Sequence, residues 1–342
     1  MKALHDLGVV EAAAAIRTGD ITAEQLCAAL LSRAEAHAAL NAFCTLDANQ
    51  VLETAREADR ARGAGKRLPP LHGVPIALKD NINTRMLPTA AGTPALRRHR
   101  PAHNAPVAQS LFDAGAILFG KVGMHELAFG ITSNNTATGA IHNPYDPSRI
   151  PGGSSGGSGA AVAARLAPAS IGSDTGGSVR VPSSFCGVWG FRPTVHRWPQ
   201  AGIVPISATR DTAGPLARNV ADLVALDGAV TGQPMDIPAR LLSTVRIGVP
   251  RAHFWDDLDH ETSRLCEAAL AALKEAGATL IEADVPDVKA LDESCGFSIA
   301  LYEVARDLDR LREDLGAHVN RLVIHLGEIA PERRRRSGSR KP

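Results

Sequence analysis

Apolar positions in the first third of the chain recur at the three-to-four-residue spacing of helices that bury one face. Thr22 and Gln25 form a capping box at the start of one such helix. Between the helical segments lie short apolar runs of strand length. The pattern predicts helices over residues 5–18, 22–39, 40–63 and 105–114, and strands over residues 73–80 and 116–119. This alternation of helices and strands is typical of an α/β protein.

Small residues dominate the middle of the chain, from Ala137 to Gly190. Two glycine-rich runs, residues 152–159 and 172–178, each lie within a few residues of an apolar segment. Flexible linkers are rich in Gly and Ser throughout, whereas glycines between ordered elements allow close backbone approach or a positive φ. We therefore expect ordered turns here. Further along, the pattern predicts a strand over 245–249, a helix over 260–276, a strand over 279–283 and helices to about residue 328.

Composition is ordinary for a globular protein, since 44% of the 342 residues are hydrophobic and 21% are charged. That balance excludes extended disorder. The formal net charge of +1 is the sum of two unlike parts, because residues 331–342 carry +5 and residues 1–330 carry −4. An acidic body argues against a nucleic-acid partner.

Targeting and redox features predict a cytoplasmic location. Acidic residues interrupt the apolar run after Lys2, so no signal peptide is expected. No apolar stretch approaches the roughly 18–20 residues of a membrane span. The five cysteines are scattered without a C-x-x-C pair, which favours free thiols in a reducing compartment over a disulfide framework or a zinc site.

Two familiar motifs occur in the wrong context. Residues 115–121 fit the phosphate-binding pattern G-x-x-x-x-G-K, but Val122 replaces the Mg²⁺-binding Ser or Thr, and the apolar middle favours a buried strand. Residues 152–156 fit G-x-S-x-G, which follows a strand in α/β-hydrolases, but prolines precede it here. His125 and His142 have the chemistry of a general base, but nothing in the sequence connects either to a serine.

Lys79, Ser154 and Ser178 remain as candidate catalytic residues. Lys79 ends an apolar strand, where burial lowers the pKa of an amine and suits it to act as a general base near neutral pH. Ser154 and Ser178 each lie in a glycine-rich turn, and the small residues before Ser178 favour successive N–H groups that point at one spot, as an oxyanion hole requires. A nucleophilic serine needs a base, and lysine is the candidate if histidine is not.

The residues around these positions resemble the amidase signature family of serine amidohydrolases. The resemblance is strongest from Gly152 to Thr194, with G-G-S-S-G-G-S-G and G-S-D-T-G-G-S-V-R. G-V-P-I-A-L-K-D-N-I at 73–82 and T-R-D-T-A-G-P at 209–215 support it, and it covers residues 5–325. It implies a single α/β/α domain whose mixed β-sheet is covered by helices on both faces.

The resemblance further implies a serine–serine–lysine triad. Ser178 would be the nucleophile, Ser154 the bridging serine after a cis peptide bond, and Lys79 the base. Ser178 would attack the amide carbon, ammonia would leave, and water would hydrolyse the acyl-enzyme. The family reaction implies neither a metal nor an organic cofactor.

Other positions receive roles from the same resemblance. The N–H groups of Thr175, Gly176 and Gly177, with that of Ser178, would stabilise the oxyanion. The residues implied to support the triad and its loops are Gly153, Ser155, Asp174 and Arg180. Phe129, Ile131 and Thr132 occupy positions that line the acyl pocket in relatives, and their apolar character favours an aryl or alkyl group.

Three amide classes compete as the substrate. The segment from His125 to Asn135, with T-R-D-T at 209–212, looks most like arylacetamide hydrolases that act on indoleacetamide or mandelamide. The second alternative is the glutamine-hydrolysing component of the glutaminyl-tRNA-forming amidotransferase, which acts with tRNA and a partner chain. A malonamide-type hydrolase is the third, since it should need a cation for a second carboxylate.

Length introduces a different alternative. Chains of this family are clearly longer than 342 residues, so we expect a C-terminal truncation followed by a disordered basic tail at 331–342. Residues 1–330 would form the amidase signature domain, with N-terminal helices in 5–63, the signature core in 73–232 and a second α/β segment in 245–328. An exposed apolar face would favour a homodimer. A truncated, inactive homologue is the alternative to a working enzyme.

Overall fold

A computed structural model describes residues 2–65, 67–233 and 237–315 of the chain. The chain divides into two compact units, one made of Met1–Met235 with Tyr302–Pro342 and the other of Asp236–Leu301. The single domain predicted over residues 1–330 stays a prediction. The basic tail predicted at 331–342 lies outside the described residues.

The elements alternate between helices and strands, as the sequence pattern predicts. The strands are β1 (Phe43–Thr45), β2 (Pro75–Lys79), β3 (Ile117–Val122), β4 (Asn134–Asn135), β5 (Gly139–Ala140), β6 (Ala169–Asp174), β7 (Trp189–Gly190), β8 (Thr212–Ala217), β9 (Arg246–Val249) and β10 (Thr279–Glu282). The α-helices are α1 (Val9–Thr18), α2 (Ala23–Ala36), α3 (Ala48–Gly63), α4 (Pro106–Asp113), α5 (Gly156–Ala163), α6 (Arg180–Phe185), α7 (Val220–Thr231), α8 (His260–Glu275) and α9 (Val288–Leu315). Short 3₁₀ helices are η1 (Leu4–Asp6), η2 (Ala38–Leu40), η3 (Pro94–Leu96), η4 (Glu126–Ala128) and η5 (Leu242–Thr244).

A six-stranded mixed sheet with the order β1-β3-β2-β6-β8-β7 forms the centre of the first unit. β2 pairs in parallel with β3 and with β6, and the other pairs are antiparallel. Every residue of β2, β3, β6 and β8 is buried, because both faces of these strands are covered. The mixed α/β fold expected from the sequence is confirmed.

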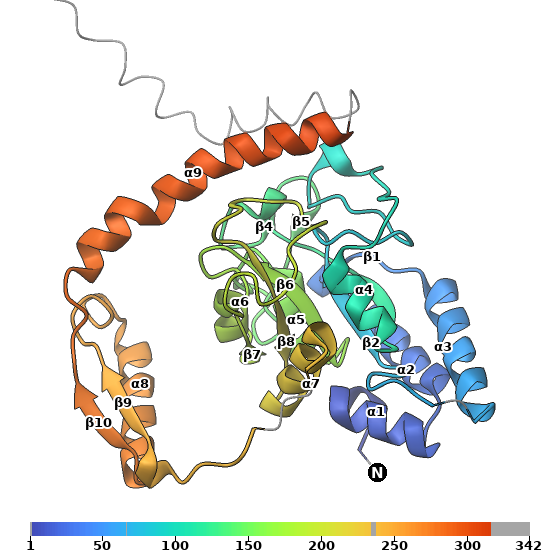
Figure 1. Cartoon of the computed structure of the whole chain (residues 1–342), viewed down its shortest axis with the longest axis horizontal. Helices are drawn as coiled ribbons and strands as arrows, with labels where there is room; N and C mark the ends of the chain where they lie inside the picture. The colour runs from blue at the N-terminus through green and yellow to red at the C-terminus, as the bar shows by residue number, and fades with distance from the viewer. Residues whose placement is uncertain (1, 66, 234–236, 316–342) are drawn as a thin grey trace, which may run out of the picture. The chain divides into compact units, whose positions relative to one another are not determined.

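Helices cover both faces of this sheet (Figure 1). The chain passes from β2 through α4 to β3 on one side of β2, and then through α5 to β6 on its other side. Parallel crossovers are right-handed, so these opposite directions place α4 and α5 on opposite faces. α4 packs with α7, whereas α5 packs against β2, β6 and β8.

One predicted helix boundary is wrong. The sequence pattern predicts a helix over residues 40–63, but β1 occupies its first part and α3 begins only at Ala48. β1 pairs antiparallel with β3, and its aromatic and β-branched residues suit a strand. The side chain of Asp47 accepts a hydrogen bond from the N–H of Gln50, and this N-cap sets where α3 starts.

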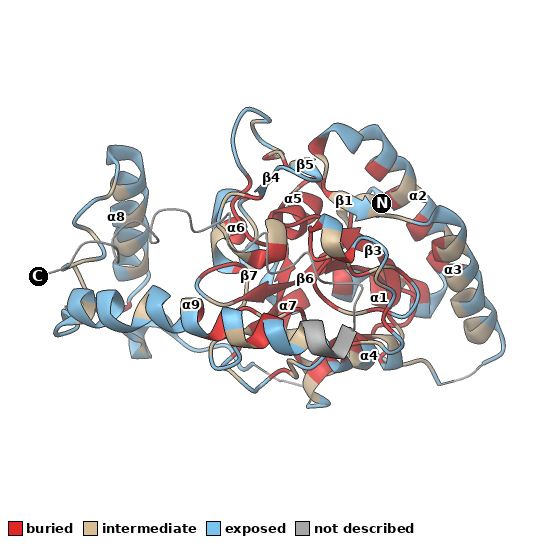
Figure 2. Cartoon of the chain, turned by 90° about the horizontal axis from the view of Figure 1, so that it is seen from above, coloured by how far each residue is buried: buried red, intermediate tan, exposed pale blue. Residues whose placement is uncertain are grey.

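The glycine-rich run at 152–159 is ordered, as expected, and it leads into α5. Nearly all of α5 is buried, which Figure 2 shows as a red helix within the first unit. A Cβ on Gly157 would lie 2.5 Å from the carbonyl oxygen of Gly123, so this helix approaches a neighbouring backbone where only glycine fits.

The second unit contains the parallel pair β9–β10 and the helix α8 that connects them. These three elements confirm the predicted strand, helix and strand. α8 has no buried residue, and large apolar side chains of the unit, such as Leu265 and Leu291, are more than half exposed. The homodimer stays a prediction. None of the five cysteines, all of which lie in the described residues, forms a disulfide, and Cys44 and Cys295 are exposed rather than buried.

Candidate active site

The site lies where two neighbouring parallel strands end. β2 ends at Lys79 and β6 ends at Asp174, and the register pairs Leu78 with Ile171. The carboxyl ends of parallel strands meet at one edge of a sheet, where α/β proteins bind ligands. The Lys79 ammonium nitrogen accordingly lies 2.9 Å from the Ser173 hydroxyl oxygen.

Lys79 and Ser154, two residues of the triad that the family resemblance implies, are in direct contact. The Lys79 Nζ atom lies 2.7 Å from the Ser154 Oγ atom, and both residues are completely buried. The peptide bond between Gly153 and Ser154 is cis, as the family resemblance implies. Burial lowers the pKa of the Lys79 amine to about 7, although the charges of Asp174 and Asp211 oppose that change. Near neutral pH the amine therefore has a neutral form that can accept a proton.

Asp174 organises the turn that carries Ser178. Its carboxylate accepts hydrogen bonds from the N–H groups of Gly177 (2.8 Å) and Val179 (3.0 Å). The guanidinium groups of Arg180 and Arg192 also contact this carboxylate. Burial opposes ionisation of Asp174, but these donors outweigh it and lower the pKa of the carboxyl group. Asp174 and Arg180 therefore both contact the turn of Ser178, and their supporting role stays a prediction.

One part of the predicted oxyanion hole needs correction. The N–H of Gly177 does not face outward, because it donates to Asp174 Oδ1. The N–H groups of Thr175, Gly176 and Ser178 make no hydrogen bond within the described residues. A Cβ on Gly176 would meet nothing within 4 Å, so the turn is open at this point. These three N–H groups are the ones free to bind an oxyanion.

The turn of Ser178 is joined to the turn of Ser154 through the backbone. The Ser178 carbonyl oxygen accepts a hydrogen bond from the Ser155 N–H at 3.2 Å. The Ser155 hydroxyl donates to the Ser173 carbonyl oxygen at 3.2 Å and connects the same turn to β6. No hydrogen bond in the described part of the chain joins the hydroxyls of Ser154 and Ser178. That last contact of the triad stays a prediction.

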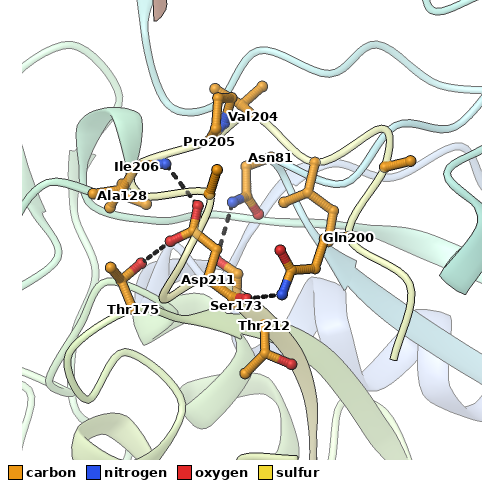
Figure 3. A pocket seen from close by; sticks show the side chains of 13 residues that line it. Asn81, Ala128, Ser173, Thr175, Gln200, Val204, Pro205, Ile206, Asp211 and Thr212 are labelled. Atoms are coloured by element: carbon orange, nitrogen blue, oxygen red, sulfur yellow. Dashed lines mark hydrogen bonds between the residues drawn. The ribbon is translucent and has the colours of Figure 1, made fainter. Parts of the chain in front are cut away.

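A cavity of about 220 Å³ adjoins these turns (Figure 3). Ser173 and Thr175 line it from the β6 side, and Asn81 lines it from the end of β2. Its other walls are largely apolar and include Ala128, Ile203, Val204, Pro205 and Ile206. The cavity therefore combines a polar end beside Lys79 with apolar walls.

Asp211 joins the cavity wall to the turn of Ser178. Its carboxylate accepts the Thr175 hydroxyl at 2.5 Å and the N–H groups of Ile206 (2.8 Å) and Ser207 (2.9 Å), and Figure 3 shows the first two of these bonds. Burial raises the pKa of this carboxyl group against the effect of its donors.

The sequence analysis missed Ser173, Asn81 and Asp211. Asn81 and Asp211 stand in the quoted motifs K-D-N-I and T-R-D-T, and Ser173 precedes the Asp of G-S-D-T-G-G-S. Their place in these motifs is the signal that would have found them. The residues predicted to line the acyl pocket, Phe129, Ile131 and Thr132, do not line this cavity, and their role stays a prediction.

The phosphate-loop-like segment and the two histidines considered as general bases make other contacts. Lys121 belongs to the fully buried β3, and its Nζ atom donates to the Ile82 carbonyl and the Thr89 hydroxyl, so the strand interpretation of residues 115–121 is confirmed. His125 contacts Thr132 through Nδ1 at 3.3 Å, and His142 contacts the Pro147 carbonyl.

The described residues contain no group of three or more His, Cys, Asp or Glu side chains arranged to hold a metal ion. Each helix within them is too short or too polar to cross a membrane.

Several known proteins similar to this chain are amide hydrolases by name. An indoleacetamide hydrolase from Agrobacterium vitis is 46% identical over 299 residues, which are 87% of this chain and 63% of that relative. A mandelamide hydrolase from Pseudomonas putida is 44% identical over 306 residues, which are 88% of this chain and 60% of that relative. The chain thus spans less than two thirds of the length of either relative.

Solved structures agree with this similarity. A crystal structure of an amidase has a TM-score of 0.83 at 35% identity and covers 89% of this chain and 69% of its own. The native peptide amidase from Stenotrophomonas maltophilia has a TM-score of 0.79 at 34% identity, with 89% and 67% covered. The sequence profile of the family described as Amidase matches residues 25–335. The chain therefore belongs to the amidase family.

Proposed function

We propose that this protein hydrolyses a small carboxylic amide to the acid and ammonia through an acyl-enzyme formed on Ser178. The observation that carries the proposal is the 2.7 Å contact between Lys79 Nζ and Ser154 Oγ, in a buried site beside the turn of Ser178. A buried lysine with a pKa of about 7 supports the role of a general base. Serine needs such a base before it can act as a nucleophile.

The proposed reaction moves protons along the three residues of the triad. Neutral Lys79 takes the proton of Ser154, Ser154 takes that of Ser178, and the Ser178 oxygen forms a bond to the amide carbon. The free N–H groups of Thr175, Gly176 and Ser178 stabilise the negative charge that develops on the carbonyl oxygen. The relay then returns a proton to the leaving nitrogen, the C–N bond breaks, and ammonia departs. Water hydrolyses the Ser178 ester by the same relay.

We propose an arylacetamide-like substrate. Two of the relatives act, by name, on indoleacetamide and on mandelamide. Each of these two substrates carries an aromatic ring near the amide. The apolar cavity walls from Ile203 to Ile206 support an aryl group, because such surfaces gain free energy from burying one.

Ammonia release from a panel of amides tests the proposal. The panel contains indoleacetamide, mandelamide, malonamate and glutamine, and the purified chain is compared with Ser178→Ala. We expect release from an arylacetamide, and a fall in kcat on the order of 10⁴–10⁶-fold in Ser178→Ala, as for nucleophiles of other serine hydrolases. Ser184→Ala, which alters an exposed serine on α6, is the matched control and should keep the wild-type rate.

Each outcome bears on a separate claim. No ammonia from any amide, with a folded wild-type protein, would refute amide hydrolysis. Activity retained in Ser178→Ala would refute the nucleophile, and an unchanged rate in Lys79→Ala would refute the base. Release from glutamine alone would replace the arylacetamide class with the amidotransferase-type amide.

A further inference from the structure

Asn81 is held rigidly at the end of β2, two residues after Lys79. Its carbonyl oxygen accepts the N–H of Val204 at 2.9 Å, and the next residue, Ile82, forms a β-bridge with Ile203. The Asn81 side chain is only 1% exposed, and its Nδ2 atom donates to the Ser173 hydroxyl at 3.0 Å. The side-chain amide is therefore fixed in one orientation.

The other end of this side chain lacks a partner. The Asn81 Oδ1 atom is buried and accepts no hydrogen bond in the described residues. Asn81 lines the 220 Å³ cavity, and Figure 3 shows its oxygen directed into the space beside Gln200. An unsatisfied buried acceptor is costly and rare in folded proteins, so one that faces a cavity indicates a donor on the ligand.

The surrounding groups indicate which donor of an amide substrate would pair with Asn81 Oδ1. A carboxamide offers one acceptor, its carbonyl oxygen, and donors on its nitrogen. The free N–H groups at Thr175 and Gly176 suit the carbonyl oxygen. Asn81 and Lys79 donate to the same Ser173 oxygen, at 3.0 and 2.9 Å, so Asn81 lies on the side of the base that serves the leaving nitrogen.

We propose that Asn81 Oδ1 accepts a hydrogen bond from an N–H of the scissile carboxamide and thereby makes the site selective for amides over esters. This inference rests on the proposed function, because it assumes that the amide reacts at Ser178. An ester of the same acid has no N–H at this position, so it leaves Oδ1 unpaired. Asn81 thus binds the leaving nitrogen while the Ser178 oxygen bonds to the amide carbon and the C–N bond breaks.

The test compares indoleacetamide with the methyl ester of indoleacetic acid in Asn81→Leu. Leucine has a similar size but no acceptor. The change also removes the donor to Ser173, which affects both substrates because both use the same base. We expect kcat/KM, which reports steps up to acylation, to fall about tenfold more for the amide than for the ester, the effect of one lost hydrogen bond. Asn83→Ala, two residues further along, is the control and should leave the ratio of the two values unchanged.

The outcomes separate this inference from the proposed function. If the wild type releases no ammonia from any amide of the panel, the proposed function fails; if it acts on mandelamide and not on indoleacetamide, the same comparison uses mandelamide and its methyl ester. If the wild type is active and Asn81→Leu loses equal activity toward both substrates, or more toward the ester, Asn81 is only a structural support of Ser173. Thermal unfolding checks that the variant is folded, and Asn81→Ala gives the same comparison if the leucine variant is not.

Discussion

Replacing Lys79 by methionine tests the central electrostatic claim about the site. Methionine has a similar length and fits a buried position, but it does not titrate. Lys79 is completely buried, and its ammonium form has Ser154 and Ser173 as its side-chain partners. The wild-type protein must therefore hold the lysine neutral or bear the cost of a buried charge, and the variant avoids both.

The magnitude follows from the two pKa values. The amine has an ordinary pKa of 10.5 and a pKa of about 7 in the folded protein, because burial disfavours its charge. Between these values the unfolded chain binds more protons than the folded protein, so the free energy of unfolding rises with pH, by at most about 1.4 kcal/mol per pH unit. From pH 7 to pH 9 the wild type should gain about 2 kcal/mol relative to Lys79→Met.

Urea unfolding at pH 7, 8 and 9 measures this difference, with Lys274→Met, at an exposed lysine on α8, as the matched control. The same titration should appear in catalysis, since only the neutral amine accepts a proton. The kcat/KM of the wild type should rise with pH through a midpoint near 7 and then level off. A stability difference that does not change with pH, or an activity midpoint near 10, would show that Lys79 is not desolvated in the way its burial indicates.

Two further predictions concern the glycine-rich turns. Gly157→Ala should destabilise the protein by at least about 3 kcal/mol, because its Cβ would lie 2.5 Å from the Gly123 carbonyl oxygen, whereas Gly176→Ala, in open space, should change stability by less than about 0.5 kcal/mol. Equal unfolding midpoints for the two variants would contradict this. Asp174→Ala should cost roughly 3–5 kcal/mol and abolish amide turnover, since it removes a buried carboxylate that two guanidinium groups and three backbone N–H groups contact. Calorimetry that finds a loss below about 1 kcal/mol would refute that role.

Much of the fold could be predicted from the sequence, because the longer helices and strands show in the regular local spacing of their apolar residues. The capping box of Thr22 and Gln25 is present at α2, and β2 ends at Lys79 as expected. β1 was missed because three residues are too few to show a strand period, and their pairing with β3 is distant in the sequence.

The site was predictable only where a residue's chemistry showed in its type and neighbours. Lys79 ended an apolar strand, so its lowered pKa could be predicted from desolvation. The direction of the Gly177 N–H could not be predicted, because it depends on the Asp174 carboxylate folding back over the turn. Asn81 was missed for a similar reason, since its significance lies in one unpaired oxygen facing a cavity, which no sequence pattern encodes.

Asp174 can organise the turn of Ser178 without keeping Lys79 protonated, because burial outweighs the effect of its charge on the pKa of that amine. Asp174 lies at the end of the strand next to Lys79, and its negative charge raises the pKa of that amine. Arg180 and Arg192 pair with the same carboxylate at 3.0 and 3.2 Å. Desolvation dominates, and the pKa of Lys79 falls to about 7.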